Sequence, residues 1–195
     1  MRSPQAAATG RTAPAGRAAP ASRERHLVEL VDTAGTPLGA ATVAEAHQAP
    51  GILHRAFSVL LMDGEGRLLL QRRADHKTRF PLRWANTCCG HPEPGQDVRE
   101  AAATRLLDEM GLTSGELREA GRFVYQAADP ATGRVEHEYD HVLIGQVRPD
   151  AQPLPDPYEV AEWCWAHPAE LASETVRHPD RYAPWLDQVV RLGTQ

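Results

Sequence analysis

The chain has 195 residues, of which 24% are charged and 42% are hydrophobic, and its formal net charge is −5. This length is typical of a single domain, and a negative charge without a basic stripe argues against a general nucleic-acid binder. No segment approaches the roughly 18 apolar residues that a membrane-spanning helix requires. We therefore expect neither a nucleic-acid nor a membrane partner. We also expect a monomer, although no feature of the composition determines the oligomeric state.

The first 23 residues differ from the rest of the chain, because they hold eight alanines, four arginines and three prolines but no acidic residue. No apolar stretch of the kind found in secretory signals follows the arginines. The prolines disfavour the amphipathic helix of a transit peptide. This composition predicts a disordered tail at 1–23 and a single folded domain at 24–195.

Apolar runs bounded by turn formers predict strands, at 27–32, 54–63, 68–73, 84–89, 121–129, 135–147 and 161–166. The turns GEGR and PATG join two pairs of these strands, so we expect hairpins of 54–63 with 68–73 and of 121–129 with 135–147. Residues 33–39 (TAGTPLG) are rich in turn formers.

Three helices are predicted, at 96–112, 168–176 and 181–192. The first is the strongest, because it is rich in good helix formers, has Asp97 near its start and has Gly111 at its end. Its apolar face at helical spacing consists of Val98, Ala102, Leu106 and Met110. The order of strands, one central helix, strands and helices predicts an α+β sandwich with a mixed sheet between helical layers.

The segment 135–141 (VEHEYDH) places Glu136, Glu138 and Asp140 on one face of a strand. On an edge strand this pattern is typical of a solvated face. Together with His47, His54 and His91 it would instead form a mixed nitrogen and oxygen metal site, which suits Mn, Zn or Fe better than Ca. His47 and His54 are seven residues apart, so the turn QAPG would have to fold the chain back.

Several basic residues could bind an anion such as a diphosphate. Arg105 and Glu109 are four residues apart on a predicted helix, which is typical of an ion pair contributing about 0.3–0.5 kcal/mol. Alternatively, Glu109 holds a divalent cation beside an anion that Arg105 contacts. The run QRRADHK, with Arg73 and Lys77, is either a solvated face or a diphosphate clamp, because arginine presents a planar fork to phosphate oxygens.

Three cysteines, Cys88, Cys89 and Cys164, are an odd and low number, which favours a reducing cytoplasmic location. A disulfide between the neighbours Cys88 and Cys89 would be strained, so a redox pair is disfavoured. Their place in NTCCGHP (86–92) leaves open a metal site, a nucleophile or an acid.

Six segments, in order, resemble those of the type I isopentenyl-diphosphate isomerases of the Nudix superfamily: HRAFSV, RRA, NTCCGHP, DEMGL, EHEYDH and a late PW. The resemblance runs from about residue 26 to 191. It implies a Nudix-type α/β/α sandwich with a mixed central sheet. It also implies that isopentenyl diphosphate is converted into dimethylallyl diphosphate.

The resemblance assigns a role to each matching residue. As catalytic groups it implies Cys89, Glu138 and Tyr125. As ligands of a buried Mn²⁺ or Zn²⁺ it implies His47, His54, His91, Glu136 and Glu138. It implies Glu109 as the holder of Mg²⁺ against the diphosphate, and as substrate contacts it implies Arg73, Lys77, Arg105 and Trp185.

These roles suit the chemistry. An isolated alkene is a poor base, so its protonation needs a well-placed acid in a dry site. A second group removes a proton from the resulting tertiary carbocation. Trp185 offers a cation–π face worth about 2 kcal/mol when desolvated, and we expect Cys88, on the other side of the strand, to be core.

The chain departs from the family pattern at Val43, where a lysine is frequent, and from a hydrolytic Nudix box at Gln96 and at Thr104–Arg105. The last two departures suit an isomerase, which does not need the additional metal carboxylates. The alternatives are a Nudix-type diphosphate hydrolase, which would release phosphate, and a non-catalytic metal-binding domain, which would take up metal without turnover.

Overall fold

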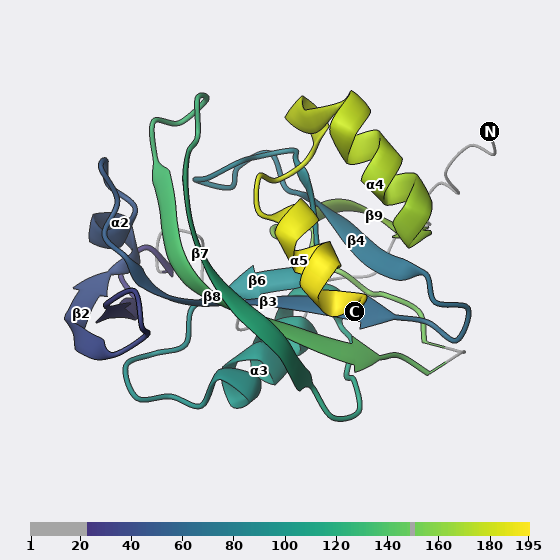
Figure 1. Cartoon of the computed structure of the whole chain (residues 1–195), viewed down its shortest axis with the longest axis horizontal. Helices are drawn as coiled ribbons and strands as arrows, with labels where there is room; N and C mark the ends of the chain where they lie inside the picture. The colour runs from purple at the N-terminus through teal and green to yellow at the C-terminus, as the bar shows by residue number, and fades with distance from the viewer. Residues whose placement is uncertain (1–22, 149–150) are drawn as a thin grey trace.

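The computed structural model describes residues 23–148 and 151–195, so the predicted tail lies outside the described residues except for Arg23. In these two ranges the strands form one nine-stranded mixed sheet (Figure 1). Its strands are β1 (Leu27–Val31), β2 (Pro37–Thr42), β3 (His54–Met62), β4 (Leu68–Arg73), β5 (Trp84–Ala85), β6 (Cys88–Gly90), β7 (Arg118–Ala128), β8 (Val135–Gln146) and β9 (Val160–Ala166). The helices are α2 (Val43–Ala46), α3 (Val98–Met110), α4 (Pro168–Arg177), the 3₁₀ helix η1 (Pro179–Arg181) and α5 (Leu186–Gly193).

Helices cover both faces of the sheet, and each face has its own apolar core. Leu106 and Met110 of α3 pack with Phe57 and Leu61 of β3 on one face. On the other face, α4 and α5 pack against Leu60 and its neighbours. The predicted α+β sandwich of a mixed sheet between helical layers is therefore confirmed.

Helix α3 starts and stops where its sequence predicts, to within two residues. The Asp97 side chain accepts hydrogen bonds from the backbone N–H groups of Arg99 and Glu100, which caps the helix. Gly111 ends it with a left-handed φ of 64°, which glycine adopts readily. The predicted apolar face is buried, and Glu109 is buried beside it.

Strands β3 and β8 lie side by side in parallel, and β7 pairs with the other edge of β8. The segment 135–141 is therefore part of an internal strand and not a solvated edge. In this register His54 is opposite Glu138 on one side, and Tyr125 is opposite Glu138 on the other. The sheet thus places three predicted site residues next to one another.

The predicted hairpin of 121–129 with 135–147 is present as β7 and β8. The hairpin of 54–63 with 68–73 forms only at its turn, where Met62 pairs with Leu68. Farther along, β6 pairs with β3, and β9 and β5 pair with β4. The strands separate because side chains of the connecting segment 86–87 lie between them and bind backbone carbonyls of both.

Three further boundaries differ from the prediction. The segment predicted as strand 84–89 is divided into β5 and β6 by those same residues. Strand β2 was not predicted, and it begins directly after the turn that Asp32 closes by accepting hydrogen bonds from Ala34 and Thr36. The last helix begins at Leu186 and not at 181, because Pro184 lacks an N–H group and disfavours helix in the residue before it. No helix among the described residues is long and apolar enough to cross a membrane.

Candidate metal centre and active site

Three histidines from different parts of the chain converge. His47 ends α2, His54 begins β3 and His91 follows β6. Their ring centroids are 4.6 to 5.1 Å apart. Gly51, with φ of 84° and with Val135 where a Cβ would lie, helps the segment between His47 and His54 to return as predicted. The nitrogen ligand atoms of these histidines and a Glu138 carboxylate oxygen all lie within 4.8 Å of one another.

The hydrogen bonds of these residues favour a divalent metal ion. Nδ1 of His47 donates to the carbonyl of Val43, and Nδ1 of His54 donates to that of Ile52, both at 2.7 Å. Donation from Nδ1 leaves Nε2 as the basic nitrogen, which is the usual arrangement in a metal ligand. Among the described residues, Nε2 of His54 is buried without a hydrogen-bond partner, and Nε2 of His47 and Oε2 of Glu136 lie buried 2.8 Å apart with no other hydrogen-bond partner. Such atoms are costly unless a cation joins them, so the donor set fits a metal.

The charges around this cluster also favour a cation. Burial and the neighbouring His91 lower the pKa of His54 to about 3, so this ring is neutral at physiological pH. Burial lowers the pKa of His47 as well, but the carboxylate of Glu136, 2.8 Å from Nε2, raises it to about 9 overall. A proton and a metal ion would therefore compete for the same position between His47 and Glu136.

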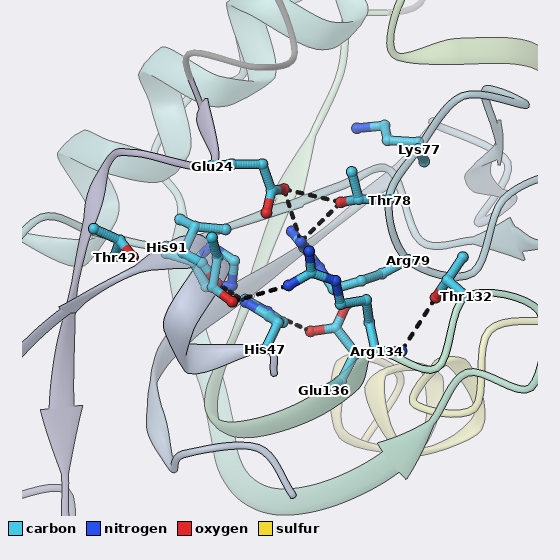
Figure 2. Close-up of polar contacts among 12 residues, drawn as sticks. Glu24, Thr42, His47, Lys77, Thr78, Arg79, His91, Thr132, Arg134 and Glu136 are labelled. Carbon is cyan, nitrogen blue, oxygen red and sulfur yellow. Dashed lines mark hydrogen bonds and ion pairs between the residues drawn. The ribbon is translucent and has the colours of Figure 1, made fainter. Parts of the chain in front are cut away.

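Arg79 contacts a predicted metal ligand, Glu136, and was missed in the sequence. Figure 2 shows its guanidinium between Glu24 and Glu136, to which it donates at 3.0 and 3.2 Å. The bond uses Oε1 of Glu136, and Oε2 remains for an ion. The sequence carried no signal for this contact, because Arg79 continues a basic run that is equally typical of a solvated surface.

Glu138 is held from two sides. The Tyr125 hydroxyl donates to Oε2 at 2.6 Å, and Nε2 of His91 lies 2.9 Å from Oε1. Burial raises the pKa of Glu138, but the histidine contacts outweigh it and hold the pKa well below its usual range. Burial and the Glu138 carboxylate raise the pKa of Tyr125 well above its usual value, so its hydroxyl keeps its proton.

The two neighbouring cysteines point to opposite faces of the sheet, as predicted. Cys88 is fully buried in the core under α3, whereas Cys89 packs with the aromatic side chains on the other face. Burial and the nearby Asp140 raise the pKa of the Cys89 thiol to about 12. Cys89 therefore carries its proton at neutral pH and is able to donate it.

A group of interacting charges lies beside α3. Lys77 contacts Glu109 at 3.2 Å and also contacts Glu159. Arg105 pairs with Glu109 along the helix and with Glu159 at 3.1 Å. Arg23 also pairs with Glu159. The ion-pair interpretation of Arg105 and Glu109 is confirmed. The interpretation that they hold a divalent cation and an anion stays a prediction.

Glu159 was not identified from the sequence, because the segment DPYEV carries no pattern that separates it from an ordinary loop. It lies immediately before β9 and is buried. In the structure its carboxylate forms ion pairs with Arg23, Lys77 and Arg105. A phosphate group could form ion pairs with the same kinds of cationic side chain.

Arg73 and Trp185 lie apart from that cluster. Nε and Nη2 of Arg73 donate to the backbone carbonyls of Arg79 and Phe80. The Arg73 guanidinium carbon lies 5.6 Å from the centre of the Trp185 ring, and Tyr125 packs on the same ring at 5.8 Å. The structure therefore places Arg73 and Trp185 with the aromatic wall near Tyr125. Within the described residues, these side-chain hydrogen bonds of Arg73 use Nε and Nη2 and not Nη1.

Comparisons with known proteins identify the family of this chain. The NUDIX domain family matches residues 52–190. A protein from Nocardia farcinica called isopentenyl-diphosphate Delta-isomerase is 61% identical over 166 residues, which covers 85% of this chain and 93% of that protein. A protein of the same name from Halorhodospira halophila is 45% identical, with coverage of 84% and 93%.

Solved structures show the same fold at low identity. DR0079 from Deinococcus radiodurans superposes with a TM-score of 0.70 at 18% identity, over 87% of this chain and all of that one. A MutT protein from Methanosarcina mazei gives a TM-score of 0.57 at 18% identity, over 71% and 91%. The sequence matches extend over most of the chain, and the chain therefore belongs to the isopentenyl-diphosphate Delta-isomerase family of Nudix-domain proteins.

Proposed function

We propose that this chain isomerises isopentenyl diphosphate to dimethylallyl diphosphate in isoprenoid biosynthesis. The observation that carries the proposal is the pair of acid–base groups on one side of the sheet. A buried thiol that keeps its proton, Cys89, lies on β6, and a carboxylate hydrogen-bonded to a tyrosine, Glu138, lies on β8. Relatives named for this activity match 84–85% of this chain.

In the proposed reaction, one of these groups adds a proton to the terminal alkene carbon and produces a tertiary carbocation. The other group removes a proton from the adjacent CH₂, and the double bond forms at its new position. One proton enters and one leaves, so no other reactant is needed. The reaction is reversible, and Cys89 and Glu138 exchange roles with its direction.

The buried divalent ion would be held by the three histidines and the two glutamates already described, His47, His54, His91, Glu136 and Glu138. When bound, it supplies positive charge that holds Glu138 in place and lowers its pKa. A mixed set of imidazoles and carboxylates suits Mn²⁺ or Zn²⁺.

The diphosphate would bind at the cluster beside α3. Glu109 offers a carboxylate to Mg²⁺, which prefers oxygen ligands and commonly binds together with substrate phosphates. Lys77 and Arg105 would contact the phosphate oxygens once Mg²⁺ occupies the carboxylates. Arg73, through Nη1, would contact the substrate nearer to Trp185.

The aromatic wall would protect the carbocation. Trp185 is 3% exposed and packs against Phe80 and Tyr125. Its ring face stabilises a cation, and the apolar surroundings exclude the water that would trap one. We also propose that the protein acts as a cytoplasmic monomer, consistent with three free cysteines in the described residues.

The deciding experiment supplies the purified protein with isopentenyl diphosphate and Mg²⁺ and follows dimethylallyl diphosphate and free phosphate together. We expect product without phosphate, loss of turnover in Cys89→Ala, and turnover largely retained in the matched variant Cys88→Ala. Equal losses in the two variants would contradict the role of Cys89. Release of phosphate would instead identify a hydrolase, and metal uptake without either product would identify a non-catalytic domain.

A further inference from the structure

Asn86 contacts both the thiol and the indole that the proposed reaction uses. It is fully buried in the two-residue segment between β5 and β6. Its Oδ1 atom lies 3.2 Å from Sγ of Cys89 and 3.0 Å from Nε1 of Trp185. A single amide oxygen therefore joins the proton-transfer group to the aromatic wall.

The other hydrogen bonds of Asn86 determine which way its amide points. Nδ2 lies 3.1 Å from the carbonyl oxygen of Val59 and 2.9 Å from that of Cys88. Carbonyl oxygens only accept, so the NH₂ group must face them, and the amide oxygen must face Cys89 and Trp185. The indole N–H only donates, so the contact with Trp185 requires the same orientation.

This orientation fixes the direction of the Cys89 hydrogen bond. An amide oxygen accepts, so Sγ donates its hydrogen to Asn86. A second hydrogen-bonding atom near the thiol is Oγ of Ser58, at 3.7 Å, and its hydroxyl donates to Asp140 at 2.7 Å. The contact with Asn86 is the shorter of the two and therefore sets the position of the thiol.

The surroundings of Asn86 make it a rigid support. Val59 belongs to β3, so the amide is anchored to a central strand at the point where β3 and β4 separate. The next residue, Thr87, donates to the carbonyl of Leu69 on β4 and accepts from the N–H of Leu61 on β3. Supports of this kind hold reacting groups within the narrow range that catalysis needs.

We propose that Asn86 is a positioning residue that holds the Cys89 thiol and the Trp185 indole in the relative arrangement that the isomerisation needs. The inference rests on the proposed isomerase function and adds a residue to it. Asn86 acts through Cys89 and Trp185, whereas the charged cluster around Lys77 and Arg105 binds the diphosphate. Loss of Asn86 should therefore lower kcat and leave KM nearly unchanged.

The kinetic test compares Asn86→Ala with Thr87→Val, which removes an equally buried polar group from the adjacent position. We expect kcat of Asn86→Ala to fall by about 100-fold, because a small misplacement of a reacting group can lower the rate by that factor. We expect little change in KM for isopentenyl diphosphate. Thr87→Val keeps both contacts of Asn86 Oδ1, so it should lower the melting temperature and reduce kcat far less than Asn86→Ala does. Equal losses of kcat, or an unchanged kcat in Asn86→Ala, would overturn the inference. A wild-type protein that forms no dimethylallyl diphosphate would instead contradict the proposed function.

An infrared measurement tests the same contact without turnover. The S–H stretch of Cys89 is assigned by subtracting the spectrum of Cys89→Ser, and a hydrogen-bonded thiol absorbs at lower frequency than a free one. We expect the low-frequency band in the wild type and its return to the free-thiol position in Asn86→Ala. If Asn86→Ala does not fold, the wild-type spectrum alone tests the inference. An S–H band at the free-thiol frequency in the folded wild type would overturn it.

Discussion

Loss of one imidazole should remove most of the stabilisation that we expect a bound metal to give this protein. We propose to remove metals with a chelator and to add back Mn²⁺ or Zn²⁺ to the wild type, to His54→Leu and to His137→Leu. His54 is a proposed ligand whose Nδ1 bonds to Ile52. His137 lies on the opposite face of β8, and its Nδ1 forms a hydrogen bond with the carbonyl oxygen of Gly51. His137→Leu is therefore a matched control, because each variant loses one hydrogen bond between an imidazole and a backbone carbonyl.

The size of the effect follows from mass action. An ion at 100 times its dissociation constant stabilises the folded state by about 2.7 kcal/mol. In a chain of this length each kcal/mol raises the melting temperature by about 2–4 °C, so the wild type should gain about 5–11 °C. If His54→Leu binds the ion about 100-fold more weakly, only about 0.4 kcal/mol remains at the same concentration, or about 1–2 °C.

The assay is thermal unfolding followed by circular dichroism at a fixed ion concentration. We expect the wild type and His137→Leu to show the full gain in melting temperature, and His54→Leu to show almost none. A full gain in His54→Leu would refute the assignment of its Nε2 as a ligand. No gain in the wild type would refute the inference that the buried nitrogen and oxygen atoms of this cluster hold a metal.

Three other predictions follow from the described contacts. Arg79→Met should weaken metal binding by about 10–100-fold in a calorimetric titration, because Glu136 loses the side chain that orients it; unchanged affinity would make Arg79 only a structural residue. Asp129→Asn should destabilise the fold by about 1–3 kcal/mol at pH 7, because its carboxylate accepts from the Phe80 N–H and two neighbours. Burial raises the pKa of Asp129, but those hydrogen bonds hold it below its usual value. The difference in unfolding free energy between the variant and the wild type, measured in urea, should therefore shrink as the pH falls through that pKa. A difference that stays constant with pH would contradict this prediction. Removal of residues 2–22 should leave turnover intact, because Arg23, the first described residue, already supplies the contact with Glu159; a large loss of kcat would show that the tail takes part in catalysis.

Local patterns predicted much of the architecture. The capping aspartate, apolar spacing and terminal glycine predicted α3 because these signals act within one element. The hairpin of β7 and β8 was predicted from its turn for the same reason. The extent of pairing between β3 and β4 was not predictable, because it depends on Asn86 and Thr87, which bind backbone groups of strands distant in the sequence.

The main residues of the proposed site were named from the sequence, since the order of the motifs around Cys89, His91 and Glu138 resembles one family. The sequence also implied that Cys88 and Cys89 face opposite sides, because side chains alternate along a strand. It did not reveal Arg79 or Glu159 as members of the site. The role of each of these two charged side chains depends on its ion-pair partners, and the fold brings those partners close from distant parts of the sequence.

What the sequence determined by itself was therefore the set of reactive groups and the periodicity of the elements that carry them. What the tertiary structure decided was the parallel pairing of β3 with β8, which places His54 opposite Glu138. It also decided the burial that raises the pKa of Cys89 and lowers that of His54. Both depend on long-range packing, because the dielectric surroundings and the charged neighbours of a side chain are determined by residues far from it in the chain.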